Sequence, residues 1–326
     1  MVKIIQGGDI KALKGKTVAV IGYGAQGRAQ ALCMHDSGVS VIVGVRKDGE
    51  SWKKVKDDGL EVTTISDAAS KGDIIHILIP DEIQGDIYEQ EIKQHVKKGK
   101  TLSWSHGFNI VFKRIIPPKD VDVIMVAPKA PGTEERKRYL EGFGVPGLIA
   151  VKQNASGKAR DTALAIAAAC GFTRAGVLDC SFENEAFEDL FGEQAVLCGG
   201  LSELIKAGFE TLVDKGYPPE MAYFECLHEM KLIVDLVYEG GLSYMWHVVS
   251  NTAEYGGRTR GKMIITDEVR KNMKKILADV ESGKFADEWI SEYKKGLPNL
   301  KRLREEEAKH PIEVVGKDIR ALFKKK

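Results

Sequence analysis

A short run near the start of the chain, residues 18–27, constrains the fold more than any other feature. Its sequence, VAVIGYGAQG, predicts a buried strand, a GxGxxG turn and then a helix, although such a turn can also have a structural role only. Gly22 allows the tight turn, Gly24 lets the backbone approach a pyrophosphate, and Gly27 lets the helix pack on the strand. The N–H groups at the start of the helix then favour phosphate binding. The predicted cofactor-binding residues of this loop are Gly22, Tyr23, Gly24, Ala25, Gln26 and Gly27.

Strand-like and helix-like stretches alternate over the first half of the chain. Six apolar runs predict strands, at Thr17–Ile21, Val39–Val45, Ile74–Ile79, Thr101–Ser105, Val121–Val126 and Gly147–Val151. Between the first runs, helices are predicted at Gln26–Ser37 and Ser51–Asp58. This alternation is typical of a Rossmann-type α/β domain, in which helices cover both faces of a parallel sheet.

The pattern changes near residue 182. From there to about residue 295 the sequence has long stretches of helical periodicity and almost no β-branched runs. We therefore predict two domains, an N-terminal dinucleotide-binding Rossmann domain over residues 1–182 and an all-α domain over residues 183–326.

The end of the second predicted strand determines which dinucleotide is bound. An NAD site places an acid there to bind the ribose 2′-hydroxyl, whereas this strand ends at Arg46 and Lys47. Together with Ser51, these residues could hold a 2′-phosphate through charge-assisted hydrogen bonds, which favours NADPH. Asp48 and Glu50 would repel a phosphate if they pointed inward, so the loop also allows NADH. A solvated basic loop without a ligand is the alternative.

Polar residues also follow the carboxyl ends of other predicted strands, where ligands bind in such a sheet. His106 is a candidate catalytic residue, although a lone histidine is more often structural. Lys129 lies between two prolines that fix its backbone, which suits a positioned cation. Gly132 in the same segment is assigned to the cofactor site. The segment after Ile79 is assigned either to the cofactor site or to capping of the next helix, and consists of Asp81, Glu82, Ile83 and Gln84.

Two acidic pairs lie in otherwise apolar segments of the second domain. Asp189 and Glu193 are four residues apart, so on a helix their carboxylates share one face. Glu225 and Glu229 repeat this spacing. A carboxylate on a buried face is costly unless it is compensated, and a set of oxygen ligands suits Mg²⁺ or Mn²⁺. We predict a site for two such divalent cations, the alternative being that the acids face solvent on amphipathic helices.

A polar stretch of small residues, from Val249 to Gly257, follows an apolar run. Ser250 in this stretch is a candidate for a substrate hydrogen bond. Its alternative role is to cap the following helix.

Composition argues against several classes of protein. A formal net charge of +1 gives no sign of a nucleic-acid or anionic-membrane partner. The 5 cysteines show no CxxC spacing, which argues against a disulfide framework and a zinc site. The start of the chain has no secretory signal, and no apolar run approaches the roughly 20 residues of a membrane span. We therefore expect a cytoplasmic protein.

Several motifs carry a family resemblance when they are taken together. They are GYGAQGRAQA (22–31), SHGFNI (105–110), VAPKAPG (126–132), DLFGEQAVLCGG (189–200), FECLHEMKLIVDL (224–236), VSNTAEYG (249–256) and HPIE (310–313). In this order they resemble the short class of the ketol-acid reductoisomerase family, over about residues 1–320. Some positions depart from the family pattern. Arg28 stands where the family usually has His and could add a cofactor contact, Ala130 replaces a usual Gly, and Thr133 and Glu134 replace a frequent His and its neighbour.

The resemblance implies a Mg²⁺-dependent alkyl migration in 2-acetolactate or 2-aceto-2-hydroxybutyrate. Reduction by NADPH would follow and give the 2,3-dihydroxy acids of valine and isoleucine biosynthesis. It further implies a knotted helical domain and a homodimer, or a higher oligomer, with shared active sites. The alternatives are a metal-free Rossmann dehydrogenase and a non-enzymatic cofactor-binding regulator.

The resemblance also implies roles for individual residues. Asp189 would bridge both Mg²⁺ ions and Glu193 would bind one of them. The partner subunit would supply the second pair and the substrate-contacting serine. The residues concerned are Glu225, Glu229 (also a catalytic residue) and Ser250, with His106 and Lys129 as further polar groups of the active site.

Overall fold

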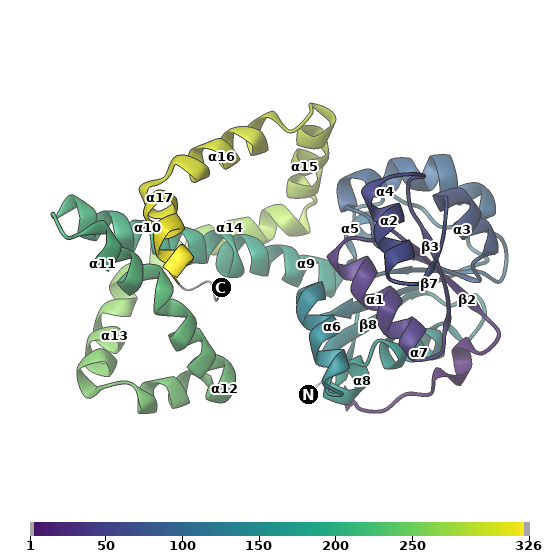
Figure 1. The fold of residues 1–326 in the computed structure, drawn as a ribbon, viewed down its shortest axis with the longest axis horizontal. Helices are drawn as coiled ribbons and strands as arrows, with labels where there is room; N and C mark the ends of the chain where they lie inside the picture. Colours follow the sequence, from purple (N-terminus) through teal and green to yellow (C-terminus); the bar gives the residue numbers. More distant parts are fainter. Residues whose placement is uncertain (1–2, 323–326) are drawn as a thin grey trace. The chain divides into compact units, whose positions relative to one another are not determined.

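The computed structural model describes residues 3–322, and the chain forms two compact units (Figure 1). The first unit spans Met1–Glu188 and the second spans Asp189–Lys326. The division falls inside helix α9 (Phe182–Gly192), which is continuous across it. The boundary that the sequence places after residue 182 stays a prediction.

A mixed sheet forms the centre of the first unit. Within the described residues it has nine strands, in the spatial order β1 (Ile4–Ile5), β9 (Val177–Cys180), β8 (Gly147–Gln153), β7 (Asp122–Pro128), β6 (Thr101–Trp104), β5 (Ile74–Ile77), β2 (Thr17–Ile21), β3 (Ser40–Gly44) and β4 (Glu61–Thr63). The strands from β7 to β4 are all parallel. Each of the six predicted strands is present, and the Rossmann-type architecture is confirmed.

One edge of the sheet is not parallel throughout. Strand β8 pairs antiparallel with β7, with Pro128 opposite Gly147. The chain leaves β7 at its carboxyl end, forms a helix and enters β8 from that same end, so β8 must run back along β7. Strands β1, β4 and β9 leave no clear pattern in the sequence, because they are short and two of them combine apolar with charged residues.

Helices cover both faces of the sheet (Figure 1). They are η1 (Ile10–Leu13), α1 (Ala25–Asp36), α2 (Glu50–Asp57), α3 (Ile65–Lys71), α4 (Asp81–Ile87), η2 (Tyr88–Ile92), η3 (Lys93–His95), α5 (Phe108–Val111), α6 (Gly132–Leu140), α7 (Ala159–Ala169) and α8 (Phe172–Ala175). Val18 and Val20 of β2 pack on one face, in a core shared with α1 and α7. Ala19 and Ile21 pack on the opposite face, in a core shared with α3. Both faces are therefore buried, as is usual for parallel strands, and polar loops lie at the strand ends.

The second unit is helical, as the sequence predicts. After α9 it contains η4 (Glu193–Leu197), α10 (Gly199–Asp214), α11 (Pro219–Tyr223), η5 (Phe224–His228), α12 (Met230–Val248), α13 (Asn251–Ile264), α14 (Asp267–Glu281), α15 (Lys284–Lys294), α16 (Pro298–Lys309) and α17 (Pro311–Leu322). Both η4 and η5 are π-helical turns. None of the helices in residues 3–322 combines the length and the apolarity that a membrane span needs.

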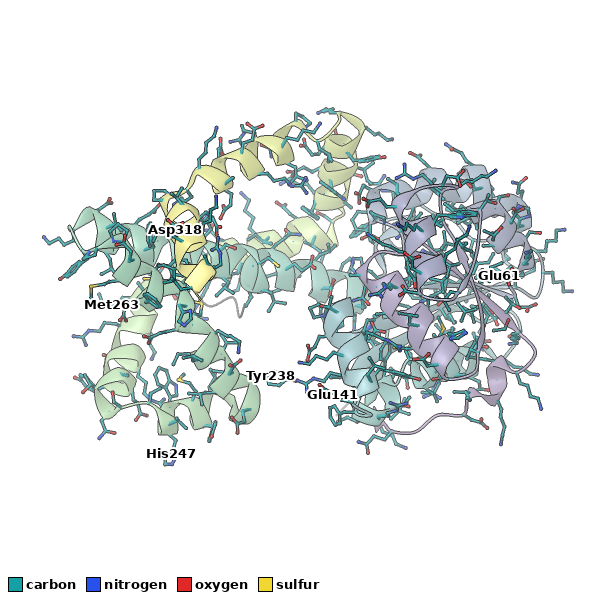
Figure 2. All side chains as sticks on the ribbon, viewed as in Figure 1. Glu61, Glu141, Tyr238, His247, Met263 and Asp318 are labelled. Carbon is teal, nitrogen blue, oxygen red and sulfur yellow. The ribbon has the colours of Figure 1, made fainter. Side chains whose placement is uncertain are left out.

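The core of the second unit is small for the number of helices around it. Its buried residues are Phe209, Ala222, Tyr223, Ile312 and Ile319. Large apolar side chains are instead exposed along α12 and α13, and Tyr238 and Met263 project from the ribbon in Figure 2. Exposed apolar surface of this extent is typical of an interaction site. The knot that the resemblance implies stays a prediction.

Candidate active site

The glycine-rich loop between β2 and α1 fits a dinucleotide. Gly22 has a φ of 103°, and a Cβ on it would lie 2.8 Å from the carbonyl oxygen of Leu78. A Cβ on Gly27 would lie 2.4 Å from the carbonyl oxygen of Gly22, so both positions require glycine. A Cβ on Gly24 would meet nothing within 4 Å, and no side chain caps α1. The loop therefore leaves open space and helix N–H groups at the point where a pyrophosphate binds.

The segment after β7 packs directly on this loop. Gln26 donates from Nε2 to the carbonyl oxygen of Ala130 at 3.0 Å. A Cβ on Gly132 would lie 2.3 Å from the carbonyl oxygen of Ala25, so the two backbones approach as closely as glycine allows. The structure thus brings together Ala25, Gln26 and Gly132, which the sequence analysis assigned to one cofactor site from two separate motifs.

The loop after β3 is exposed at its basic residues. Arg46 and Lys47 face solvent, and Gly49 donates its N–H to the carbonyl oxygen of Arg46 at 3.3 Å. The carboxylate of Glu50 lies 3.8 Å from the Lys54 ammonium along α2, so Glu50 has a cation beside it. Such a turn offers its positive charges to a ligand.

The segment after β5 begins helix α4 rather than capping it through Asp81. Pro80 holds the cap position, and Asp81 is the first residue of the helix. The Gln84 amide is buried, donates to Asp81 and accepts from Trp104 Nε1 at 3.0 Å, which gives it a structural role. Burial raises the pKa of Asp81 to about 6, and the nearby charge of His106 lowers it. Glu82 and Ile83 are half-buried beside it.

A buried carboxylate that no sequence motif indicated connects two of the candidate catalytic residues, His106 and Lys129. Glu185 on α9 is 1% exposed, and its Oε2 lies 3.1 Å from His106 Nδ1. The same oxygen accepts the N–H of Gly107 at 2.9 Å, and Oε1 accepts from Lys129 Nζ at 3.2 Å. Burial alone would raise the pKa of Glu185, but the bond and charge of His106, with those of Lys129 and Gly107, lower it below its usual range. Glu185 is therefore ionised and holds both side chains.

The predicted metal ligand Asp189 lies one helical turn after Glu185 on α9. The ligand atoms of His106, Glu185 and Asp189 lie within 4.8 Å of one another. Glu185 lies four residues before Asp189, just as Glu193 lies four residues after it. This spacing was the signal in the sequence that could have identified Glu185.

The remaining predicted ligands lie on π-helical turns. Glu193 is exposed and opens η4, whereas Glu225 is exposed inside η5 and Glu229 is exposed directly after it. The wider π turn alters the plain helical spacing that the sequence suggested, and such turns are frequent at functional sites. Among the residues that the structure describes, the one cluster of three potential ligands is that of His106, Glu185 and Asp189. That the four predicted acids, Asp189, Glu193, Glu225 and Glu229, meet at one metal site stays a prediction.

Ser250 caps helix α13, which was the alternative to its substrate role. Its Oγ accepts the N–H of Ala253 at 3.2 Å, and the residue is exposed. A contact between Ser250 and a substrate stays a prediction.

Comparison with known proteins identifies the family of this chain. Residues 12–176 match the model of the acetohydroxy acid isomeroreductase NADPH-binding domain, and residues 182–325 match that of the ketol-acid reductoisomerase C-terminal domain. The chain belongs to the ketol-acid reductoisomerase family. A ketol-acid reductoisomerase (NADP(+)) of Akkermansia muciniphila is 62% identical over 317 residues, covering 97% of each chain.

Two further relatives in the family are named for the other cofactor. A ketol-acid reductoisomerase (NAD(+)) of an uncultured archaeon is 61% identical, over 98% of this chain and 97% of its own. A solved structure of an NADH-preferring ketol-acid reductoisomerase from an uncultured archaeon has a TM-score of 0.96 at 60% identity, covering 99% and 100% of the two chains. Relatives of nearly equal identity thus differ in cofactor, so overall similarity does not decide between NADPH and NADH, whereas NAD(P)H binding is common to them.

Proposed function

We propose that this chain catalyses the Mg²⁺-dependent ketol-acid reductoisomerase reaction. In 2-acetolactate the methyl group of C2 moves to C3, and hydride from NAD(P)H then reduces the new ketone at C2. The homologous substrate 2-aceto-2-hydroxybutyrate would react in the same way, and the 2,3-dihydroxy acids formed belong to valine and isoleucine biosynthesis. The observation that carries this proposal is the Glu185 cluster, because it lies at the strand ends that also hold the glycine-rich loop.

The chain's own residues hold charge and protons at this site. Because Glu185 is ionised, it can only accept hydrogen bonds, so the Nδ1 of His106 carries the proton between them. This bond orients the imidazole and fixes its tautomer. Glu185 also keeps Lys129 close to the strand ends, where its charge can stabilise negative charge on a substrate.

The metal ligands proposed for two Mg²⁺ ions are Asp189 and Glu193 from one subunit, with Glu225 and Glu229 from its partner. Their carboxylate oxygens are the hard donors that Mg²⁺ prefers. Three of them are exposed, namely Glu193, Glu225 and Glu229. When bound, the two cations supply Lewis-acid polarisation of the substrate's ketone and hydroxyl oxygens. Glu185 is not assigned as a ligand, because its oxygens already accept from His106, Gly107 and Lys129.

We further propose a homodimer with shared active sites. The exposed apolar side chains of α12 and α13 support it, because a second copy could bury them. Ser250 would then contact the substrate of the partner's site. Higher assembly and a cytoplasmic location are part of the same proposal and rest on the family alone.

NADPH is the proposed cofactor, with NADH as an alternative. Arg46 and Lys47 are exposed and basic at the end of β3, where a 2′-phosphate would lie. Arg46→Ala should raise the KM for NADPH about tenfold and that for NADH by less than about twofold. Equal losses would show that Arg46 does not contact the 2′-phosphate.

The activity is tested by following NADPH oxidation with 2-acetolactate, with and without Mg²⁺. We expect oxidation only when the enzyme, the substrate and Mg²⁺ are all present. Turnover that is unchanged after removal of all divalent cations would contradict the metal assignment. No turnover under any condition would contradict the proposed function.

A further inference from the structure

Three side chains of the first unit tie the glycine-rich loop to the end of helix α2. The hydroxyl of Tyr23 donates to Asp58 Oδ2 at 2.8 Å. Arg28 donates from Nε to Asp58 Oδ2 and from Nη2 to Asp58 Oδ1, each at 2.7 Å. Asp58 thus accepts three hydrogen bonds, from the loop and from the first turns of α1. These three residues are called the Asp58 clamp below.

Helix physics alone does not explain the position of Asp58. It follows the last residue of α2, where the helix dipole is negative and a carboxylate is disfavoured. The guanidinium of Arg28 compensates this charge and holds the pKa of Asp58 below its usual range. Burial raises the pKa of Tyr23, so its hydroxyl stays a donor at neutral pH. Asp58 is 17% exposed whereas Arg28 is 53% exposed, so solvent screens the acid only in part.

The opposite end of α2 follows the loop that is proposed to contact the cofactor ribose. Helix α2 starts at Glu50, and Asp48 and Gly49 separate it from the basic residues Arg46 and Lys47. The helix has 8 residues and buries Val55 completely, so one short rigid element joins its two ends. A shift at its Asp58 end therefore shifts the basic loop at its other end, and errors of about 1 Å in placement affect recognition strongly.

We infer that the Asp58 clamp is a positioning device for cofactor recognition. It sets the spacing between the loop that binds the pyrophosphate and the loop that contacts the ribose 2′ group. Arg28 and Asp58 are positioning residues, since they act through α2 and the glycine-rich loop rather than by touching the cofactor. The inference rests on the proposed function in one respect, namely that Arg46 and Lys47 contact a 2′-phosphate.

The first unit contains a matched pair that serves as a control. Arg160 donates from Nε and Nη2 to the two carboxylate oxygens of Asp179, at 3.2 and 2.7 Å. Its side chains are 51% and 50% exposed, so it is also a solvent-accessible bidentate Arg–Asp pair. It joins α7 to β9, whereas the clamp joins α1 to α2. Loss of this pair should affect stability in a similar way and leave cofactor recognition unchanged.

The test compares Arg28→Met, Asp58→Asn, their double variant and Arg160→Met in the full-length chain. Dissociation constants for NADPH and NADH are measured by quenching of protein fluorescence without substrate, and KM and kcat are measured with 2-acetolactate and Mg²⁺. We expect Arg28→Met to weaken NADPH binding about tenfold and NADH binding about twofold. Its kcat at saturating NADPH should stay within about twofold of the wild-type value. The double variant should lose no more than the worse single variant, because the two residues act as one unit. Arg160→Met should change neither dissociation constant.

Several results would overturn the inference. They are equal weakening of NADPH binding and NADH binding in Arg28→Met, additive losses of NADPH affinity in the double variant, or the same loss of NADPH affinity in Arg160→Met. If Arg28→Met does not fold, Arg28→Lys replaces it, since lysine keeps the charge without the bidentate geometry. Arg28→Lys should weaken NADPH binding by about threefold. An unchanged dissociation constant for NADPH in this variant would contradict the proposed role of the clamp. Failure of the proposed function is separately visible, because the wild-type chain would then bind NADPH but oxidise none with 2-acetolactate.

Discussion

The carboxylates of the two units lie in opposite surroundings. In the first unit Glu185 is buried and accepts hydrogen bonds from a histidine, a lysine and a backbone N–H. In the second unit Glu225 is exposed in the π-helical turn η5 and Glu229 directly after it, ahead of the exposed apolar side chains of α12. Keeping a buried carboxylate ionised requires hydrogen-bond donors or cations around it. The first unit supplies them for Glu185, whereas Glu225 and Glu229 present their oxygens to solvent, where a cation and a partner can reach them.

The largest effect is expected for a change at Glu193, the first residue of η4. Glu193→Gln should lower turnover of 2-acetolactate by about 100-fold or more, because it removes a charged oxygen donor from the proposed metal site. The dissociation constant for NADPH should stay within about twofold of the wild-type value. Turnover measured over a range of Mg²⁺ concentrations, with NADPH binding measured alongside, tests this prediction.

Glu188→Gln is the matched control for that variant, since Glu188 is exposed on the preceding helix α9 and has no assigned role. It should behave as the wild-type chain does. Equal losses in the two variants would mean that the effect comes from changing the charge of this region, and the metal assignment of Glu193 would then be wrong.

The buried side of the comparison is tested by Glu185→Gln. The amide keeps the shape of the side chain but removes the negative charge that contacts both Lys129 and His106, so kcat should fall by about 10- to 100-fold. NADPH binding should change little. Glu183 lies on the same helix as Glu185 and forms a solvent-accessible ion pair with Lys152. Glu183→Gln should leave kcat unchanged. A Glu185→Gln variant with full kcat would reduce this cluster to a structural contact.

The sequence predicts the first unit better than the second, and the reasons are physical. Apolar runs and the glycine spacing follow from burial and from backbone sterics, which are local, so β2 and the Gly22–Gly27 loop match their predictions. The direction of β8 depends on where the chain re-enters the sheet, and no local pattern encodes it. Glu185 was missed because its burial depends on residues 56 and more positions away in sequence, such as Lys129.

The acids of the second unit show a different limit. Their spacing predicts shared helix faces, but the π turns η4 and η5 change the local pitch and leave no recognisable pattern in the sequence. Whether these acids meet depends on a second chain, and a single sequence cannot specify that geometry. Glu135 gives a further example, since its segment GTEERKRYL looks like a solvated helix and yet this carboxylate is fully buried.

Glu135 extends the comparison to stability, because neither of its carboxylate oxygens has a hydrogen-bond partner. Burial raises the pKa of Glu135 to about 9 from an ordinary value of 4.5. As pH rises above 4.5 the unfolded chain ionises this group while the folded chain keeps its proton, so stability falls until the folded group ionises near pH 9. Glu135→Gln should remove this loss, so its stability relative to the wild-type chain should rise by about 1.4 kcal/mol per pH unit between about pH 6 and about pH 8.

Urea unfolding of both chains at several pH values measures that difference. Glu134→Gln, which alters a neighbouring acid that pairs with Arg138, should show no such pH dependence. A difference between Glu135→Gln and the wild-type chain that is constant with pH would show that Glu135 is not held protonated by burial.

The smallest expected effect concerns the two possible roles of Ser250. Ser250→Ala removes the cap of α13 and should cost about 1 kcal/mol of stability, and Thr266→Ala should cost about the same because Thr266 caps α14 in the same way. If Ser250 also contacts substrate in a shared site, its variant alone should raise the KM for 2-acetolactate, by about three- to tenfold. Thermal unfolding gives the first quantity and steady-state kinetics the second. An unchanged KM in Ser250→Ala would confine this serine to capping and would remove one of the contacts by which the second unit is proposed to complete its partner's site.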